Sequence, residues 1–260
     1  MEAGSFDHRF GGIQRLYGVE EAEKIRTASI CVVGVGGVGS WIAEAAARCG
    51  IGNITLIDWD DICLTNSNRQ IHAMNGTVGK GKVDVMAERI ALINPACNVT
   101  PIREYLTEEN YDRLLSPGFD YVFDAIDNVS AKCLIINECK WRKIPLIVSG
   151  GAGGRIDPMK IQSADLSRSF DDSLLAKVRR KLRTDYNYPR NPKRKFKVPC
   201  VFSPEKPRYP QGDGCVAAEK PQGQNMKLDC FSGFGTATFI TGVFGFAMTA
   251  YAVKEIAGKE

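Results

Sequence analysis

Short apolar runs alternate with longer segments of mixed polarity along the first 150 residues of the chain. The run at 30–36 (ICVVGVG) is rich in β-branched residues and ends in glycines, which is typical of a buried parallel strand. Helix-forming residues follow at 38–48, and a second apolar run, ITLI, follows at 54–57. This succession predicts a β-α-β unit.

The same alternation continues to residue 149. We expect further helices at 82–94, 108–115 and 130–143, and further strands at 99–102, 121–125 and 145–149. Strands that alternate with helices predict an α/β fold with a doubly wound, mostly parallel, Rossmann-like sheet. Ligands of such sheets bind at the carboxyl ends of the strands.

The composition changes after residue 154, where Pro, Lys and Arg become frequent. We interpret 1–155 as a nucleotide-binding domain and 156–260 as a basic, loop-rich appendage packed on the same core, rather than as more sheet. The uncharged stretch 235–253 is long enough to span a bilayer, but its threonines and glycines favour a helix buried in the core.

The composition is that of an ordinary soluble protein, with 44% apolar and 25% charged residues among 260. None of the nine cysteines stands in a C-x-x-C pair, which argues against a zinc site made of four thiolates. We therefore expect no zinc, a reducing cytoplasm as the location, and core positions for most cysteines.

A glycine-rich loop stands between the first strand and the first helix of the β-α-β unit. Gly34, Gly36, Gly37 and Gly39 allow a tight turn and bring backbone N–H groups to a helix N-terminus, where a phosphate binds well. Asp58 lies nineteen residues after Gly39, at the end of the next strand, where it can bond a ribose hydroxyl. The spacing predicts a nucleotide, which can be NAD, FAD or ATP.

The residues that follow favour ATP. Asp60 belongs to the acidic group that begins at Asp58, and Asn66, Arg69 and Lys82 come next. An amide and two cations can hold three phosphates and stabilise a departing pyrophosphate, while a carboxylate can bind Mg²⁺. The alternative is that Arg69 and Lys82 are ordinary surface charges.

The segments 34–70 and 78–95 resemble the ubiquitin-activating-enzyme-like adenylyltransferases, and the similarity covers residues 9–155. The resemblance implies that Gly36 and Gly37 line the phosphates, that Asp58 binds the ribose and that Asp127 holds Mg²⁺, with Asn128 beside it. It implies triphosphate contacts by Asn66, Arg69 and Lys82. A helix cap is the alternative for Asp127 and Asn128.

Members of that family use an N-terminal arginine that reaches into a partner subunit's site, and we expect this chain to form a homodimer. The usual position of this arginine falls on Gly12 in this chain, so Arg15 or Arg9 is the candidate. A solvated surface arginine is an equal alternative.

Motifs along nearly the whole chain resemble the tRNA threonylcarbamoyladenosine dehydratases. They are RFGGIQRLYG at 9–18, NRQIHA at 68–73, GGAGG at 150–154, CVFS at 200–203 and CFSGFG at 230–235. The resemblance implies that ATP and Mg²⁺ adenylate the carboxylate of threonylcarbamoyladenosine at tRNA position 37, and that the group then cyclises with loss of water. The competing interpretation is an adenylyltransferase for the C-terminal glycine of a ubiquitin-like sulfur carrier.

The stretch 177–197 carries ten Lys or Arg residues against one Asp, with aromatic rings among them. Together with the resemblance, this indicates a surface that follows tRNA phosphates and stacks on bases. The residues we assign to tRNA contact are Arg179, Arg180, Lys193, Arg194 and Lys195.

Three smaller expectations remain open. The resemblance links Cys230 to sulfur transfer from a cysteine desulfurase system, with a buried, inert thiol as the alternative. His72 can assist a proton transfer, although a structural hydrogen bond is favoured. A structural monovalent cation is a further open question.

Overall fold

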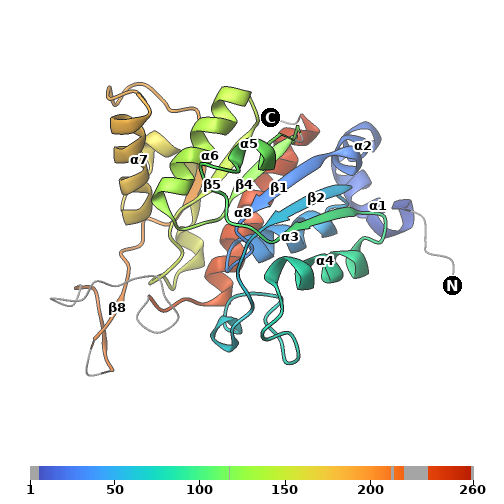
Figure 1. Cartoon of the computed structure of the whole chain (residues 1–260), viewed down its shortest axis with the longest axis horizontal. Helices are drawn as coiled ribbons and strands as arrows, with labels where there is room; N and C mark the ends of the chain where they lie inside the picture. The colour runs from blue at the N-terminus through green and yellow to red at the C-terminus, as the bar shows by residue number, and fades with distance from the viewer. Residues whose placement is uncertain (1–5, 117, 212–213, 220–233, 259–260) are drawn as a thin grey trace.

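The computed structural model describes residues 6–116, 118–211, 214–219 and 234–258 (Figure 1). Within this part of the chain, seven strands form one sheet in the order β3-β2-β1-β4-β5-β7-β6. Every neighbouring pair is parallel except β6 and β7. The strands are β1 (Ser29–Val33), β2 (Asn53–Ile57), β3 (Asn98–Ile102), β4 (Tyr121–Asp124), β5 (Leu146–Ser149), β6 (Gln162–Asp165) and β7 (Pro199–Phe202).

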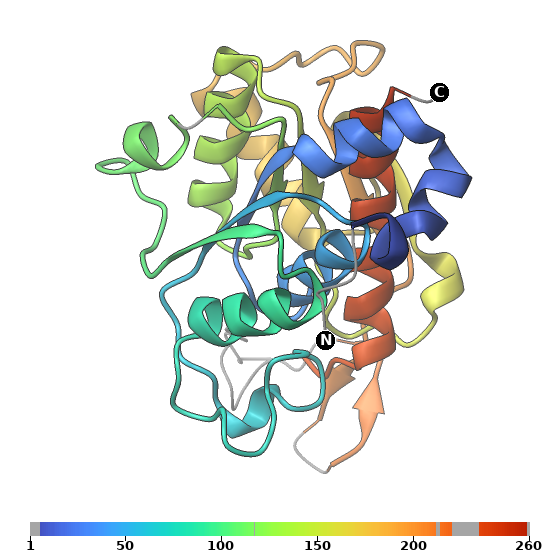
Figure 2. The same cartoon turned by 90° about the vertical axis from the view of Figure 1, so that its right-hand side faces the viewer.

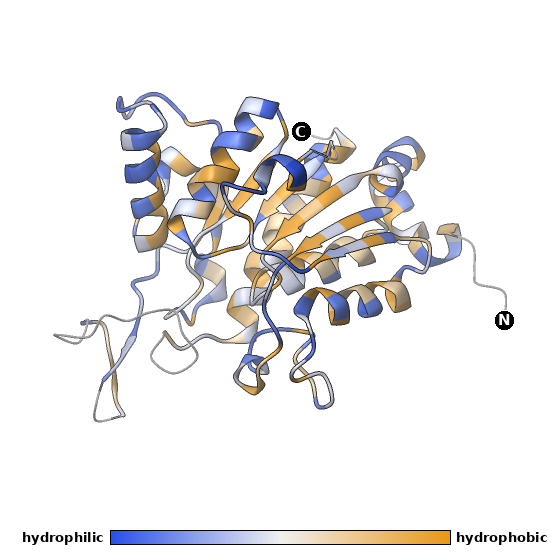
Figure 3. Cartoon of the chain, in the orientation of Figure 1, coloured by the Kyte–Doolittle hydropathy of each residue, from blue (hydrophilic) through white to orange (hydrophobic). Residues whose placement is uncertain are grey.

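Helices cover both faces of the sheet, as the alternating pattern predicts. The helices are α1 (Phe6–Tyr17), α2 (Val19–Thr27), α3 (Gly39–Arg48), α4 (Lys82–Ile93), α5 (Tyr111–Leu114), α6 (Val129–Arg142), α7 (Ser173–Asp185) and α8 (Thr238–Ala257). Ile30 and Val32 of β1 pack with α3, α4 and α8, whereas Cys31 and Val33 pack with α6 and α7. Successive residues of the strand therefore face two separate halves of the core, and the central strands are orange in the hydropathy colouring (Figure 3).

The α/β fold and the elements expected up to residue 149 are confirmed. Each expected strand and helix is present, with ends shifted by a few residues. The helices α1 and α2 lie before β1, and the sequence pattern did not predict them. In Figure 2 they lie beside the upper half of α8.

The expectation that the sheet ends near residue 154 is wrong. β7 pairs with β5 in parallel, and β6 pairs with β7 in the opposite direction, so the sheet runs across the proposed boundary at 155. The basic stretch is also not all loop, because its first part is the helix α7. Both strands are four residues long, which makes their pattern too short to separate from loops rich in proline.

The apolar C-terminal segment is a core helix. α8 is long and apolar enough to span a membrane by length and composition alone. However, one face of it is fully buried against α3 and the sheet, through Ile240, Phe244, Met248 and Ala252. Gly245 allows this close packing, because a Cβ there would come within 2.7 Å of the Trp41 side chain.

Loops gather at one end of the molecule, where the parallel strands end. The connection from β2 to α4 projects there, and so does the short hairpin of β8 (Tyr209–Pro210) and β9 (Val216–Ala217) (Figures 1 and 2).

Candidate active site

A cavity of about 1090 Å³ opens at the carboxyl ends of β1, β2, β4 and β5. Ten of the residues assigned to nucleotide binding line it, although they come from five separate segments of the chain. They are Gly34, Gly36, Gly37, Asp58, Asp60, Asn66, Arg69, Lys82, Asp127 and Asn128.

The glycine-rich loop turns tightly between β1 and α3. Gly34 has φ 86°, in the region that favours glycine, and its N–H donates to the Ile57 carbonyl at 2.8 Å. A Cβ on Gly39 would lie 1.7 Å from the Gly34 carbonyl oxygen, so only glycine fits there. Gly39 therefore shapes the loop from behind, while Gly36 and Gly37 line the cavity.

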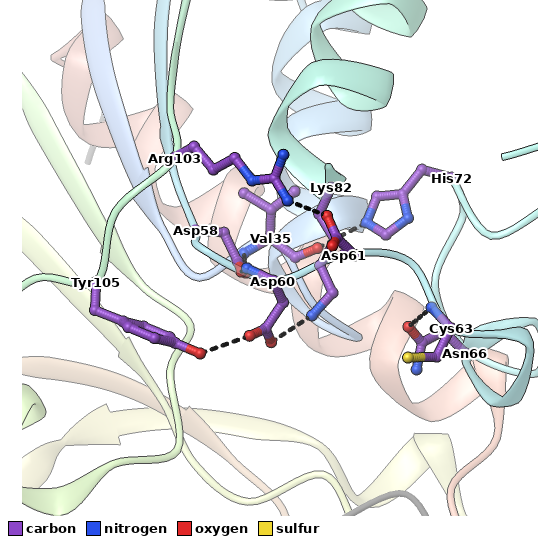
Figure 4. A network of polar contacts seen from close by, with 10 residues as sticks. All are labelled: Val35, Asp58, Asp60, Asp61, Cys63, Asn66, His72, Lys82, Arg103 and Tyr105. Atoms are coloured by element: carbon purple, nitrogen blue, oxygen red, sulfur yellow. Dashed lines mark hydrogen bonds and ion pairs between the residues drawn. The ribbon is translucent and has the colours of Figure 1, made fainter. Parts of the chain in front are cut away.

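Asp58 braces this loop. Its Oδ2 accepts a hydrogen bond from the Val35 N–H at 2.7 Å, and its Oδ1 accepts one from the Asp60 N–H at 2.9 Å (Figure 4). Each carboxylate oxygen has further acceptor capacity, so Asp58 can hold the loop and still accept a ribose hydroxyl.

Lys82, the first residue of α4, is paired with Asp60. The Lys82 Nζ lies 2.8 Å from Asp60 Oδ2, and the Tyr105 hydroxyl donates to Asp60 Oδ1 at 2.7 Å (Figure 4). Burial alone would raise the pKa of Asp60, but the hydrogen bonds from Lys82 and Tyr105 outweigh it and lower that pKa. Because the Lys82 side chain is only 8% exposed, its ammonium group is held in one place beside the cavity.

Asn66, Arg69 and Gln70 form the next part of the wall. Asn66 Oδ1 accepts from the Cys63 N–H at 3.0 Å, which leaves its Nδ2 as the group for a ligand. Arg69 Nη1 donates to the Thr65 carbonyl at 2.9 Å. Gln70, which directly follows Arg69, was not among the expected site residues. Its side chain is buried, and its Oε1 has no hydrogen-bond partner among the described residues.

A buried ion pair lies beneath Asp127. Lys132 Nζ is 2.8 Å from Asp124 Oδ1, and both side chains are 0% exposed. Burial raises the pKa of Asp124, and Lys132 opposes that rise. The pair joins the end of β4 to α6, and the loop between them carries Asp127 into the cavity, where its side chain is exposed. Asn128 caps α6, since its side chain accepts from the Ala131 N–H at 3.0 Å.

Glu44 fixes the two helices that begin at the site. It is 4% exposed, and it pairs with Arg48 of α3 at 2.7 Å and with Arg89 of α4 at 2.6 Å. Burial would raise its pKa, but the hydrogen bonds and charges of Arg89 and Arg48 together outweigh burial and lower that pKa.

The cavity continues past the end of β5 to residues that the sequence analysis did not assign. Gly150–Gly153, Arg155, Asp172 and Ser173 line this second part. Asp172 caps α7 through the Leu175 N–H at 2.9 Å and also accepts from the Gly151 N–H at 2.9 Å. The GGAGG motif at 150–154 pointed to this segment without giving it a role, whereas Arg155, Asp172 and Ser173 have no spacing that could reveal that they meet.

The candidate arginines of the N-terminal segment lie away from the cavity of their own chain. Arg15 is exposed on α1 and is not among the lining residues. Arg9 is also exposed and donates to the Ile93 carbonyl at 3.2 Å.

The basic stretch presents an exposed charged surface, but two of its three rings are buried and the third, Tyr186, is half-buried. Tyr188 and Phe196 are 5% and 0% exposed and pack edge to face on each other, because both complete the core beside α6 and α7. Arg179 is half-buried and donates to the Ser169 hydroxyl. The other four residues assigned to tRNA contact are exposed: Arg180, Lys193, Arg194 and Lys195.

Core positions were expected for most cysteines, but only four of the eight described ones are buried: Cys31, Cys133, Cys139 and Cys200. Cys49 and Cys97 are half-buried, and Cys63 and Cys215 are exposed. Cys230 lies outside the described residues. His72 is fully buried, with its Nε2 2.8 Å from the Val35 carbonyl oxygen, and burial lowers its pKa. This contact is the structural hydrogen bond favoured for His72.

Fold and cavity together define a nucleotide-binding α/β protein, and the model of the ThiF family matches residues 12–260. The chain is 51% identical over 252 residues to a tRNA threonylcarbamoyladenosine dehydratase of Escherichia coli K12, covering 96% of this chain and 94% of that protein. The chain therefore belongs to the ThiF family and, within it, to the tRNA threonylcarbamoyladenosine dehydratases.

Two further comparisons bear on the choice between a dehydratase and a sulfur-carrier adenylyltransferase. A crystal structure of the Escherichia coli dehydratase TcdA in complex with ATP matches with a TM-score of 0.87 and 45% identity, over 99% of this chain and 97% of that one. The molybdopterin-synthase adenylyltransferase of Escherichia coli K12 is 32% identical over 174 residues, which cover 64% of this chain and 69% of that protein. The similarity to the dehydratase includes the C-terminal part, with β6, β7 and α7.

Proposed function

We propose that this protein is an ATP-dependent dehydratase that cyclises N6-threonylcarbamoyladenosine at position 37 of tRNA. The observation that carries the proposal is the similarity to the Escherichia coli dehydratase over nearly the full length of both chains. The cavity supports it, because glycines, an amide and two cations meet at the carboxyl ends of the strands.

The reaction needs an activated carboxylate, because a carboxylate is a poor electrophile until its oxygen becomes a leaving group. The threonyl carboxylate of the substrate attacks the α-phosphorus of ATP, which forms an acyl adenylate and releases pyrophosphate. A nucleophilic atom of the carbamoyl group then attacks the acyl carbon, closes the ring and expels AMP. The substrate loses one water in total, and ATP is converted to AMP and pyrophosphate.

The residues of the cavity act by position and charge. Arg69 and Lys82 neutralise the triphosphate and the departing pyrophosphate, while the N–H groups of the glycine-rich loop hold phosphate oxygens. The pairing of Lys82 with Asp60 fixes the ammonium group before ATP binds, so little reorganisation is needed during the reaction.

The chemistry of the wall fits Mg²⁺ bound together with the nucleotide. Mg²⁺ is usually held by one or two carboxylates and by substrate phosphates, and Asp127 is an exposed carboxylate in this cavity. Bound there, Mg²⁺ would supply positive charge to the phosphates. The described residues contain no group of three potential His, Cys, Asp or Glu ligands.

The exposed cations of the basic stretch are the proposed contact for tRNA phosphates. Ser173 and Leu174, at the start of α7, line the cavity, and the helix leads from there to the basic segment. A tRNA that follows this surface brings its modified base toward the cavity. Shape and charge, rather than stacking by Tyr188 and Phe196, support this contact.

We further propose that the enzyme is a homodimer in the cytoplasm, with Arg15 completing the partner's site. Phe239 and Phe246 are about half exposed on one face of α8, where a second subunit could cover them. A link of Cys230 to a cysteine desulfurase system, and a structural monovalent cation, also remain proposals.

The test is a reaction of purified protein with tRNA that carries threonylcarbamoyladenosine, ATP and Mg²⁺. Mass spectrometry of the digested nucleosides should show the loss of one water from the modified base, with AMP and pyrophosphate formed. Lys82→Met should abolish most of this activity, whereas Lys80→Met, an exposed position two residues away, is the matched control. Absence of the dehydrated nucleoside would contradict the proposal.

The same reaction mixture separates the competing function. Pyrophosphate release that depends on the modified tRNA supports a dehydratase. Release that depends instead on a small protein ending in Gly-Gly would indicate a sulfur-carrier adenylyltransferase.

A further inference from the structure

The cavity is large for a single nucleotide. Its volume of about 1090 Å³ lies above the range of roughly 300–1000 Å³ that is usual for one small ligand. The side that holds the glycine-rich loop, Asp58 and Lys82 is accounted for by ATP. The remaining side, which we call the second lobe, is lined by Gly150, Gly153, Arg155, Ser173, Pro207 and Phe234.

Arg155 is the charged residue of the second lobe whose donors are not all used. Its Nη1 donates to the Gly153 carbonyl at 2.9 Å, and its Nε donates to the Ser203 carbonyl at 3.3 Å. These two bonds fix the plane of the guanidinium group. Its Nη2 donates no hydrogen bond to a residue that the structure describes, and the nearest carboxylate oxygen, on Asp172, is 3.7 Å away. The side chain is only 5% exposed, so this donor is held at the wall of the cavity.

Asp172 is the counter-charge of Arg155, but it makes no hydrogen bond to Nη2. Its two oxygens accept the N–H groups of Gly151 and Leu175, so its charge is shared with these donors and the Arg155 Nη2 is left to bind an anion. An arginine keeps its charge at any ordinary pH, and the fixed position of Arg155 lowers the entropy lost when it binds a ligand.

The backbone of the glycine run adds donors to the same lobe. The N–H groups of Ala152 and Gly153 have no acceptor among the described residues, although both residues line the cavity. A Cβ on Gly153 would lie 2.8 Å from the Phe234 side chain, so a side chain at this position would have to displace that ring. An arginine nitrogen and two backbone N–H groups are a donor set suited to a carboxylate.

We propose that the second lobe binds the threonylcarbamoyl group of the substrate, with Arg155 and the N–H groups of Ala152 and Gly153 holding its carboxylate. This inference rests on the proposed function and names the side of the cavity that selects the substrate. The position of the lobe supports it, since Ser173 and Leu174 begin the helix that leads to the basic surface.

The test compares tRNA that carries threonylcarbamoyladenosine with the same tRNA in which the carboxylate is a methyl ester. Binding is measured by fluorescence anisotropy without ATP, so that no turnover occurs. The wild-type protein should bind the acid at least about tenfold more tightly, as expected for a hydrogen bond to a charged group. Arg155→Gln should lose that preference and keep its affinity for unmodified tRNA and for ATP. Arg208→Gln, an exposed arginine outside this cavity, is the matched control and should keep the preference.

Several results would overturn the inference. One is an equal affinity of the wild-type protein for acid and ester, and another is an Arg155→Gln variant that retains the preference. If Arg155→Gln does not fold, Arg155→Lys, which keeps the charge, should show a reduced preference, and an unchanged one would overturn the inference. Failure of the proposed function is separate, because it appears as a lack of dehydrated nucleoside with wild-type enzyme.

Discussion

Replacing Lys132 by methionine removes one partner of the buried ion pair beneath the active site. Lys132 and Asp124 are both 0% exposed, and their charged atoms are 2.8 Å apart. Asp124 Oδ2 already has no hydrogen-bond partner among the described residues. Lys132→Met therefore leaves a buried carboxylate with only the Ile126 N–H, at 3.3 Å, on its other oxygen.

The expected cost in unfolding free energy is about 3–5 kcal/mol, as found when one partner of a buried pair is removed. For a chain of this size, each kcal/mol lowers the melting temperature by roughly 2–4 °C, so a fall of roughly 6–20 °C is expected. Burial already raises the pKa of Asp124, and loss of Lys132 raises it further. The folded variant then favours the protonated carboxyl, so its destabilisation should be larger at pH 8 than at pH 5.

Thermal and urea unfolding, followed by circular dichroism, measure this cost. The control is Lys181→Met, which breaks an ion pair of 2.7 Å with Asp185 on the surface of α7 and should lower the stability far less than Lys132→Met does. The double variant Asp124→Leu with Lys132→Met should recover most of the lost stability, since it removes both charges. A loss under about 1 kcal/mol for Lys132→Met at pH 8, or a double variant as unstable as the single one, would refute the reasoning.

Three further predictions concern the site and its supports. Asp60→Asn leaves Lys82 without its charged partner, so its ammonium group is no longer held in position. In a steady-state assay, kcat should fall by up to roughly 100-fold while the KM for ATP does not rise. An unchanged kcat would contradict this prediction. Glu44 has a lowered pKa, so its stabilising effect is present above its unfolded pKa of about 4.3 and is lost as the pH falls through the folded value. The melting temperatures of wild type and Glu44→Gln should therefore differ at pH 6 and converge toward pH 3. Reversal of the charges of the basic stretch should weaken tRNA binding with little change in ATP affinity, and equal tRNA affinity would argue against this surface. The residues to reverse are Arg179, Arg180, Lys193, Arg194 and Lys195.

The sequence by itself was sufficient for the α/β class and for the residues that line one side of the cavity. Buried parallel strands are recognisable because both of their faces are apolar, and the glycine-rich loop is recognisable because phosphate binding needs residues without side chains at set positions. Asp58 directly follows β2, and Lys82 is the first residue of α4. The topology of parallel strands then brings them to one edge of the sheet, and the structure places them there.

Other features depend on contacts between distant segments, and only the tertiary structure decided them. The strands β6 and β7 are only four residues long, so their place in the sheet comes from the pairing of β7 with β5 and of β6 with β7 rather than from their own pattern. Tyr188 and Phe196 belong to a highly charged stretch of the sequence, yet both rings are buried in the core beside α6 and α7. Arg155 and Asp172 lie seventeen residues apart in sequence and meet at the second lobe only because the fold brings the end of β5 to the start of α7. Periodicity reports which face of an element is buried, whereas the partner it is buried against is a property of the whole chain.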